Sequence, residues 1–390
     1  MPDSDTPATA PPSPPVRYGG EQSNRYSPLT PLFWHGMRVG EWVRLLREHR
    51  FGLTGRGYRR FCTISPVAVL NSIASLYERL KYRPRVNRVE LPAAPIFVLG
   101  HWRSGTTMLH EMLIRDPQHA YPDTYQCYTP HHFNMSRRWV TPITAWMLPK
   151  QRPMDNVAAG WSRPQEDEFA LMNLGLPSPY RCWAFPDDGP VDTEALTLAG
   201  FSSDELTRWK AALEYFIKAV TLRDERRMVL KSPPHTARIG VLLDIFPNAK
   251  FVHITRDPLT LFPSTVRLWQ SMCDTQGLQT RRQHHPWIEP LVLDNLAAMY
   301  AAFERDRPAI PDGQFAEIRY EQLVAQPHDE LGRVYAELDL GDFSRVEPNL
   351  AEYLGENKSY QTNRYQLAPE VEATIRQRWS RYFELFGYEN

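Results

Sequence analysis

One short stretch of this chain restricts its fold more than any other. An apolar run, residues 96–99, ends at Gly100, and Gly105 follows just before a segment whose apolar residues have helical spacing. A buried strand, a glycine turn and a helix N-terminus therefore follow one another directly. Backbone N–H groups in such a turn point inward and the helix dipole favours negative charge, so the turn is predicted to bind an anion.

The turn departs from the nucleotide-binding loop that its spacing suggests. Gly100-x-x-x-x-Gly105 matches a Walker A loop, but Thr106 stands where the lysine should follow. The cation lies inside the loop instead, at Arg103, whose planar guanidinium suits oxyanions. Hydroxyl side chains in or beside the loop are Ser104, Thr106 and Thr107. We expect a phosphate-like group to be held without the lysine that usually contacts a γ-phosphate.

Further strand–turn–helix units follow along the chain. Apolar runs predict strands at residues 96–99, 228–230, 250–255 and 315–319, each followed by a helical pattern. This alternation predicts an α/β protein with a P-loop-like three-layer fold, in which helices flank a central parallel sheet. Ligands of such sheets bind at the carboxyl ends of the strands. Arg103, Lys231 and Arg256 all stand at or just past such ends.

Composition suggests the domain boundaries. Residues 1–28 are rich in Pro, Ser, Thr and Ala and are predicted to be a disordered tail. An N-terminal helical region covers 29–93 and the main domain 94–390, with a mainly helical insertion at 117–222 that covers the site. Aromatic residues alternate with arginines in residues 32–61. This segment either lies on a membrane surface or packs on the domain with its arginines in water, and the packed arrangement is favoured.

The bulk composition excludes several classes. Lys+Arg and Asp+Glu number 45 each, so no overall charge points to nucleic acid. The four cysteines are far apart and form no C-x-x-C, which argues against zinc and a disulfide framework and favours free, buried thiols. No secretory signal and no run of about 18 apolar residues is visible. We therefore expect a soluble or peripheral cytoplasmic protein, with its oligomeric state left open.

Two further positions carry cations at strand ends. Arg256 ends one predicted strand, and Ser264 falls two turns into the next helix, so the pair suits a second, separate phosphate. The alternative is an Asp-Pro helix start with a surface arginine. Lys231 ends another strand and is placed to neutralise charge on a leaving group. The alternative for Lys231 is a snorkelling lysine at a sheet edge.

These motifs together resemble a known family. They are Arg-Ser-Gly-Thr-Thr (103–107), Leu-Lys-Ser-Pro-Pro-His (230–235), Arg256 with Ser264, and Arg-Tyr-Glu-x-Leu-Val (319–324). The chain resembles the sulfotransferases that use 3′-phosphoadenosine 5′-phosphosulfate (PAPS). Within them it is most similar to the large bacterial family that is also similar to tyrosylprotein sulfotransferases. The resemblance runs from about residue 96 to the C-terminus.

The resemblance implies a role for each motif. The loop residues Arg103, Ser104, Gly105, Thr106 and Thr107 would hold the 5′-phosphosulfate. Arg256 and Ser264 would hold the 3′-phosphate, with Tyr320 near the nucleotide and Lys231 near the bridging oxygen. Lys358, within residues 356–360, either closes over the nucleotide or lies in a surface loop. No metal is implied. The sulfuryl group would pass to a hydroxyl or amine of a small-molecule, carbohydrate or lipid acceptor.

The sequence leaves open which residue acts as the base that takes the acceptor's proton. In the tyrosylprotein enzymes a glutamate follows the loop by about two dozen residues, and Thr124 stands at that place here. Glu166, Glu168 and His132 are the candidates for the base. The two glutamates also suit a first helical turn, where acidic residues favour the dipole. His132 also suits a structural histidine. Glu166 is preferred.

Two other functions remain compatible with the sequence. A kinase or NTPase would share the fold, but the chain lacks the loop lysine and an acidic strand end that would hold Mg²⁺. A non-catalytic nucleotide-binding protein would use the same scaffold. Protection by adenosine 3′,5′-bisphosphate rather than by ATP with Mg²⁺ distinguishes the first alternative, and transfer activity distinguishes the second.

Overall fold

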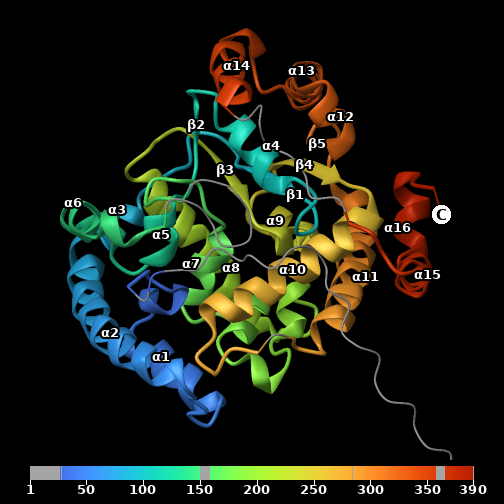
Figure 1. Cartoon of the computed structure of the whole chain (residues 1–390). Coiled ribbons are helices and arrows are strands. Elements are labelled where there is room, and N and C mark those ends of the chain that lie inside the picture. The colour runs from blue at the N-terminus through green and yellow to red at the C-terminus, as the bar shows by residue number, and fades with distance from the viewer. Residues whose placement is uncertain (1–26, 28, 150–158, 283, 357–364, 390) are drawn as a thin grey trace, which may run out of the picture.

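A parallel sheet organises the molecule (Figure 1). The computed structural model describes residues 27, 29–149, 159–282, 284–356 and 365–389. Among these, one sheet of five strands has the order β2-β3-β1-β4-β5, and every pair is parallel. The strands are β1 (Ile96–Leu99), β2 (His119–Ala120), β3 (Arg227–Lys231), β4 (Lys250–Thr255) and β5 (Phe315–Arg319). The four strands expected from the apolar runs are confirmed.

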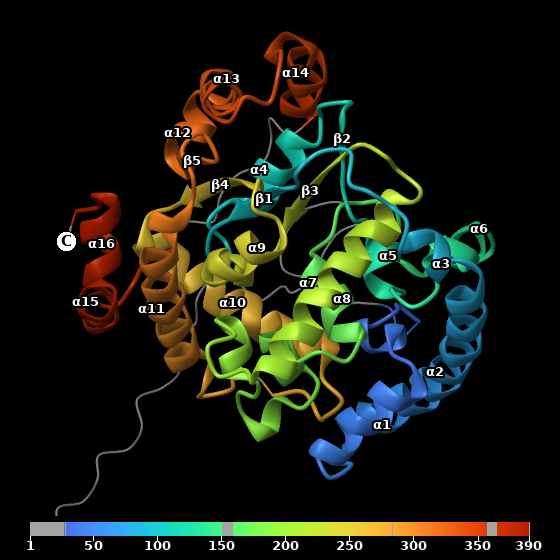
Figure 2. The ribbon, with the colours of Figure 1, turned by 180° about the vertical axis from the view of Figure 1, so that it is seen from behind.

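Both faces of the sheet are buried. Ile96 and Val98 of β1 belong to one apolar cluster, and Phe97 and Leu99 belong to the other. Successive side chains of a strand point to opposite faces, so every residue of β1 meets a helical layer. The expected three-layer α/β fold is confirmed (Figure 2).

Helices of the main domain form the two layers. The first layer contains α4 (Thr106–Leu113), α12 (Tyr320–Ala325), α13 (Pro327–Leu338) and α14 (Glu347–Glu356). The second contains α9 (Ile239–Ile245), α10 (Pro258–Gln276), α11 (Ile288–Asp306), α15 (Pro369–Arg378) and α16 (Ser380–Phe386). The helical pattern expected at 235–246 is divided into a 3-10 turn, η6 (Pro233–Ala237), and α9. The break falls at Arg238, whose φ of −127° and ψ of 19° are not helical.

The strand order creates a switch point at β1. The chain places β2 and β3 on one side of β1, and then β4 and β5 on the other. Val98 lies opposite both Lys231 of β3 and Val252 of β4. Turns that leave the sheet in opposite directions open a crevice at the carboxyl ends. Arg103, Lys231 and Arg256 therefore stand at one edge of the sheet.

The remaining helices belong to the N-terminal region and the insertion. The N-terminal helices are α1 (Val39–Glu48), α2 (Arg56–Lys81) and α3 (Arg83–Val86). The insertion contains α5 (Thr124–Tyr128), α6 (Phe133–Thr144), α7 (Asp167–Asn173) and α8 (Ser203–Thr221). The insertion begins with β2. The sequence did not indicate this strand, because two residues are too few to show the alternation of apolar and polar side chains that is typical of a strand. The tail predicted at 1–28 lies almost wholly outside the described residues.

The aromatic segment at 32–61 packs on the domain. Trp34 and Trp42 are buried, and the Trp34 indole donates to the Gln276 carbonyl at 2.8 Å. The expectation that its arginines lie in water is wrong for Arg56 and Arg60. Both donate to backbone carbonyls near the end of α10, including Asp274 and Gly277. Helix C-termini leave such carbonyls without helical partners, and arginine satisfies them.

The structure shows where the cysteines lie and whether any described helix could span a membrane. Cys127, Cys182 and Cys273 are free and buried as expected, whereas Cys62 is free but exposed on α2. Across the residues that the structure describes, no helix is long and apolar enough to cross a membrane.

Candidate active site

The glycine turn after β1 has the shape of an anion cradle. Gly100 and Gly105 have φ of +145° and +105°, and Arg103 is left-handed with φ of +69°. A Cβ on Gly105 would lie 2.5 Å from a ring carbon of Tyr320. Glycine is therefore required there by the backbone conformation and by the close approach of the ring. Helix α4 begins at Thr106, directly after Gly105, so the N–H groups of its first turn lie beside the glycine turn without helical acceptors.

Ser104 forms its hydrogen bonds within the glycine turn. Its hydroxyl donates to the His101 carbonyl at 2.8 Å, and its N–H bonds to the same carbonyl at 3.1 Å. Ser104 is fully buried. Both of its donors close the turn in this structure, and the expected contact of the Ser104 hydroxyl with a ligand stays a prediction. Its role is to fix the loop around Arg103 and Gly105.

The residues expected to hold the 5′ anionic groups and those expected to hold the 3′-phosphate are in direct contact. Arg103 donates from Nε to the Ser264 hydroxyl at 3.0 Å, and Arg256 donates to the Arg103 carbonyl at 2.9 Å. The Arg256 guanidinium lies over the Tyr320 ring, 4.1 Å from its centroid. Two guanidinium groups, a hydroxyl and an aromatic ring are thus gathered from β1–α4, β4–α10 and β5–α12. Such a cluster suits a ligand with more than one anionic group.

The turn from β4 into α10 is fixed by its neighbours. Asp257 caps α10 by accepting from the N–H groups of Leu259 at 3.2 Å and Thr260 at 3.0 Å. The Tyr382 hydroxyl of α16 accepts from the Arg256 N–H at 3.2 Å and donates to its carbonyl at 3.1 Å. The Asp-Pro start is therefore a genuine helix cap that also aims Arg256 at the loop.

Lys231 pairs with Glu166. Its Nζ lies 2.6 Å from Glu166 Oε1, and the lysine side chain is only 3% exposed, against 15% for the glutamate. The other oxygen, Oε2, accepts from the Tyr180 hydroxyl at 2.6 Å, and the Trp102 indole donates to Tyr180 at 2.8 Å. Burial, together with the Glu166 charge, raises the pKa of Tyr180 well above its ordinary value. Tyr180 therefore stays protonated and joins the glycine turn to the carboxylate.

A buried polar layer supports this pair. Asp167 accepts from the Ser232 hydroxyl at 2.9 Å and lies 2.6 Å from His235 Nε2. Burial alone would raise the pKa of Asp167, but attraction to His235 and hydrogen bonds from His235 and Ser232 hold it below its usual range. Ser232 also accepts from the Glu168 N–H at 3.1 Å. The start of α7, next to Glu166, is therefore tied to the residue after Lys231.

The structure separates Glu168 from the proposed proton transfer. Its carboxylate is fully buried, 2.6 Å from Arg238, and accepts from the Ser178 hydroxyl at 2.7 Å. A carboxylate held by a guanidinium and a hydroxyl is a structural ion pair. These partners favour a structural role for Glu168 over a role as base, and the three consecutive acids at 166–168 in the sequence do not indicate them.

His132 is also committed elsewhere. Its ring nitrogens contact the Ser136 hydroxyl at 2.7 Å and the Asn71 amide oxygen at 3.0 Å, which joins the start of α6 to α2. Burial lowers the pKa of His132 to about 4. These contacts favour the structural interpretation of this histidine over a role as base. Thr124 begins α5 and donates its hydroxyl to the Arg163 carbonyl at 3.1 Å, so it offers no carboxylate.

Other residues singled out by the sequence fall outside the cluster. Lys358 lies outside the described residues. The sequence also suggests that Trp146, Trp161, Tyr180, Trp183 and Trp269 either line an acceptor pocket or pack in the core, with packing favoured for most. Trp183 and Trp269 are buried and pack against each other with centroids 5.5 Å apart. Trp161 is also buried, whereas Trp146 is exposed on the outside of the insertion.

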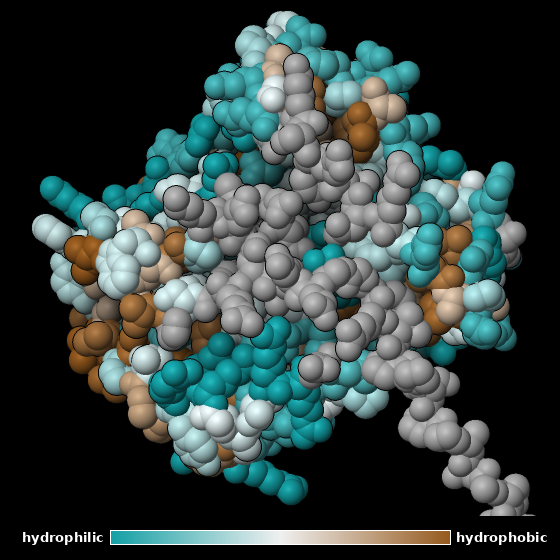
Figure 3. Space-filling model, viewed as in Figure 1, coloured by the Kyte–Doolittle hydropathy of each residue, from teal (hydrophilic) through white to brown (hydrophobic). Residues whose placement is uncertain are grey.

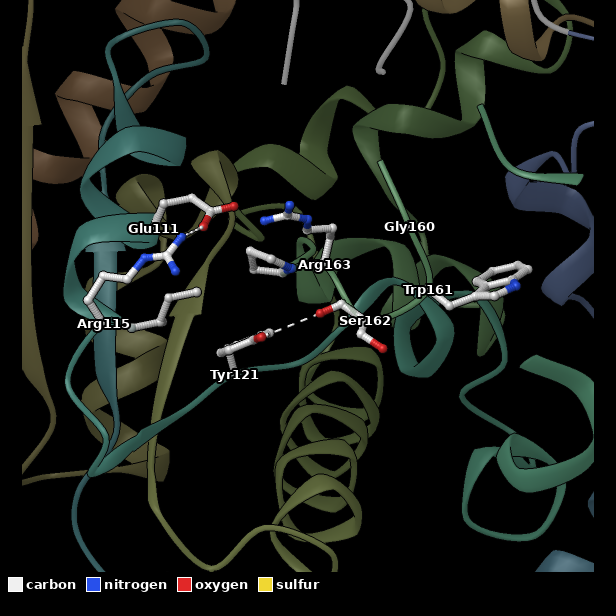
Figure 4. A pocket seen from close by; sticks show the side chains of 9 residues that line it. Glu111, Arg115, Tyr121, Gly160, Trp161, Ser162 and Arg163 are labelled. Atoms are coloured by element: carbon white, nitrogen blue, oxygen red, sulfur yellow. Dashed lines mark hydrogen bonds and ion pairs between the residues drawn. The ribbon is translucent and has the colours of Figure 1, made fainter. Parts of the chain in front are cut away.

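A side cavity of about 430 Å³ opens between α4 and the segment 160–164 (Figure 4). Glu111 and Arg115 pair across its wall at 3.3 Å, and the Tyr121 hydroxyl donates to the Ser162 carbonyl at 3.4 Å. Among the described residues that line it, Trp161 is one of the aromatic residues suggested for an acceptor pocket, and the strand-end motifs contribute none. The cavity is therefore distinct from the strand-end cluster.

Sequence reasoning gives Trp102 no role in the site, and it gives Tyr180 only the choice between lining an acceptor pocket and packing. Trp102 lies within the loop motif, and the sequence around Tyr180 suits packing or pocket lining. Their hydrogen bonds to each other and to Glu166 depend on the insertion folding back onto the loop. The only signal in the sequence is the clustering of aromatic residues near polar motifs.

Comparisons with known proteins decide the family. The sulfotransferase family matches residues 95–344. The omega-hydroxy-beta-dihydromenaquinone-9 sulfotransferase Stf3 of Mycobacterium bovis is 36% identical over 356 residues, 91% of each chain, and so is Stf3 of Mycobacterium tuberculosis. This chain belongs to the sulfotransferase family. It is therefore a transferase of sulfuryl groups, and PAPS is the donor that the family implies.

Solved structures agree on the fold. Sulfotransferase STF9 from Mycobacterium avium aligns with a TM-score of 0.61 at 21% identity and covers 81% of this chain and 82% of its own. STF1 from Mycobacterium tuberculosis aligns at 0.58 with 18% identity over 88% and 91%. Within the described residues, no group of three or more metal-ligating side chains is present. Independence from metal stays a prediction.

Proposed function

We propose that this sulfotransferase transfers the sulfuryl group of PAPS to a hydroxyl of a small, lipid-like acceptor, with Glu166 as the base. The observation that carries the proposal is the Lys231–Glu166 pair at 2.6 Å beside the loop. The curated relatives, 36% identical over 91% of the chain, are named for a menaquinone derivative, which supports an apolar acceptor with a hydroxyl. A cytoplasmic location stays a prediction.

The nucleotide would be held by both arginines. Arg103, with the turn around Gly105 and the N–H groups of Thr106 and Thr107, suits the 5′ anionic groups. Arg256 and Ser264 suit the 3′-phosphate, and Tyr320 lies against Arg256. The Arg103–Ser264 and Arg256–Arg103 hydrogen bonds, at 3.0 and 2.9 Å, support one continuous site rather than two. Positioning and charge stabilisation by these residues are the main contributions to such a transfer.

Glu166 and Lys231 would divide the remaining work. PAPS supplies the sulfuryl group, which leaves its phosphate oxygen as the acceptor oxygen forms the new S–O bond. Glu166 accepts the proton of the acceptor hydroxyl, and Lys231 neutralises the charge left on the phosphate oxygen. Their ion pair at 2.6 Å places the two side chains side by side before substrates arrive. Tyr180 orients Glu166 by its hydrogen bond of 2.6 Å.

Separate measurements test binding and transfer. Adenosine 3′,5′-bisphosphate should raise the melting temperature of the protein, and R103A and R256A should weaken its binding by roughly tenfold or more, because each loses a charge-assisted contact. ATP with Mg²⁺ should protect less. Equal binding by the arginine variants and the parent protein would contradict the nucleotide assignment.

The transfer step uses isotopically labelled PAPS with a lipid extract, and the sulfated product is identified by mass spectrometry. E166Q should lose about 10²–10⁴-fold in turnover, the usual contribution of a general base, while it still binds adenosine 3′,5′-bisphosphate. The matched control is E214Q, because Glu214 is an exposed partner of Lys218 on α8. Normal turnover by E166Q would reject Glu166 as the base. Labelled product only among water-soluble compounds would reject the lipid-like acceptor.

A further inference from the structure

The outward face of α2 is apolar. Residues 61–77 contain no charged side chain. Large apolar or aromatic side chains that recur at helical spacing are nevertheless exposed there: Val69, Leu70, Ile73, Leu76, Tyr77 and Leu80. Leu80 is 81% exposed. The buried face of the helix has Ile64 and Ala68 in its first half and the polar residues Asn71, Ser75 and Glu78 in its second. The larger apolar stripe of this helix therefore faces outward, where nothing in the described chain covers it.

Helix α6 continues this surface. Trp139 and Ile143 of α6 are 67% and 70% exposed, and Trp146 in the following 3-10 turn is 70% exposed. Helix α2 packs against α6, and Tyr77 and Trp139 line the same groove. Apolar side chains gather over these two helices at the left edge of Figure 3. We call these exposed residues of α2 and α6 the α2–α6 face.

Positive charge surrounds the α2–α6 face. Exposed basic residues at its margins are Arg59 before the stripe, Arg79, Lys81, Arg83, Arg85 and Arg88 after it, and Arg138 on α6. The acidic residue near the end of the stripe, Glu78, is buried and accepts from the Met135 N–H at 2.9 Å. Apolar and tryptophan side chains within a basic margin suit the boundary between anionic headgroups and acyl chains.

A second copy of the chain fits this face less well. Basic residues flank the stripe at both ends, so two α2 helices laid together in either direction bring like charges together. Anionic headgroups are complementary to both ends at once. Among the described residues no helix could span a membrane, so the face would lie on the bilayer.

We propose that the α2–α6 face docks the protein on the surface of an anionic lipid bilayer. The proposal uses no residue of the strand-end site. It agrees with a lipid-like acceptor, a point that rests on the proposed function, because docking would hold the enzyme where such an acceptor dissolves.

Vesicle sedimentation tests the proposal with the full chain. The protein is mixed with vesicles of phosphatidylcholine alone or of equal parts phosphatidylcholine and phosphatidylglycerol, with no acceptor present. It should sediment with the anionic vesicles, and rising salt should weaken the binding because the charges are screened. L70Q/I73Q should bind about tenfold or more weakly, since two large apolar side chains are lost from the contact.

The matched control is V324Q, because Val324 is an exposed apolar residue on α12, across the molecule from α2 (Figure 1). It should bind vesicles like the parent protein. Circular dichroism and adenosine 3′,5′-bisphosphate binding should be unchanged in both variants, which shows that they fold and keeps this test separate from the proposed function. Failure of the parent protein to bind anionic vesicles, or equal binding by L70Q/I73Q, overturns the proposal. So does a dimer in vesicle-free solution that L70Q/I73Q abolishes, which would assign the face to self-association.

Discussion

Single residues decide how the site connects its parts. Tyr180 is the clearest case, because its hydroxyl accepts from Trp102 in the glycine turn and donates to Glu166. The glycine turn and the proposed base are thereby joined by one side chain. The motifs around Arg103, Lys231 and Arg256 are visible in the sequence, because a cation directly after an apolar strand is typical of an anion-binding strand end. Tyr180 is not, because an aromatic residue in an insertion is usually there for packing.

We expect Y180F to lower turnover by roughly tenfold while adenosine 3′,5′-bisphosphate binding stays unchanged. Removing the hydroxyl frees Glu166 to turn and leaves the buried Trp102 indole without its acceptor. Turnover and nucleotide titration are measured on the same preparation. Y353F is the control. Tyr353 lies on α14 with its ring beside Arg115, and phenylalanine keeps that ring. An equal loss of nucleotide binding and turnover in Y180F would indicate a structural role alone.

At the scale of elements, α2 is attached by close backbone contact. A Cβ on Gly57, in its first turn, would lie 1.7 Å from the Leu278 carbonyl oxygen. Arg56 and Arg60 reach the carbonyls after α10 from the same turn. The sequence indicates a helical region at 29–93 from its spacing, but not which of its faces is covered. That face is set by the end of α10, which lies far along the chain.

We expect G57A to destabilise the protein by about 2–3 kcal/mol, because the methyl group cannot fit without moving backbone. G40A is the control in α1, since no atom lies within 4 Å of its added Cβ. That change should be neutral or stabilising by about 0.5–1 kcal/mol, as alanine favours a helix over glycine. Urea unfolding of both variants measures the difference. Similar stability of G57A and G40A would contradict the packing of α2 on Leu278.

The whole molecule buries several histidines as neutral groups. Burial lowers the pKa of His35 and His132 to about 4 and that of His101 and His131 to about 3, below the ordinary 6.5. Between pH 6.5 and these values the unfolded chain binds protons that the folded chain excludes. Stability is therefore complete above pH 6.5 and falls as the pH drops.

We expect the free energy of unfolding to fall by on the order of 10 kcal/mol between pH 7 and pH 4 as the four histidines become protonated in the unfolded chain. Each histidine that is protonated only in the unfolded chain contributes on the order of 1.4 kcal/mol for every pH unit below its unfolded pKa. Urea titrations at a series of pH values measure the slope. H132Q should remove the contribution of one proton, on the order of 1.4 kcal/mol per pH unit, from the dependence of the unfolding free energy on pH. This change in slope is expected whatever the effect of H132Q on stability at pH 7. A stability that is constant from about pH 7 to pH 4.5 would show that these histidines are protonated in the folded protein.

Local pattern in the chain is enough to specify the parallel sheet, its four main strands, the glycine turn and the cations at the strand ends, because each depends on spacing or on a strand's own apolar run. The choice between Glu166, Glu168 and His132 required the folded molecule, since burial and partners such as Arg238 and Asn71 come from distant segments. Folding also turns Ser104 inward and leaves one face of α2 uncovered. Long-range packing chooses among side chains that local pattern makes equivalent, and that is the physical reason for the division.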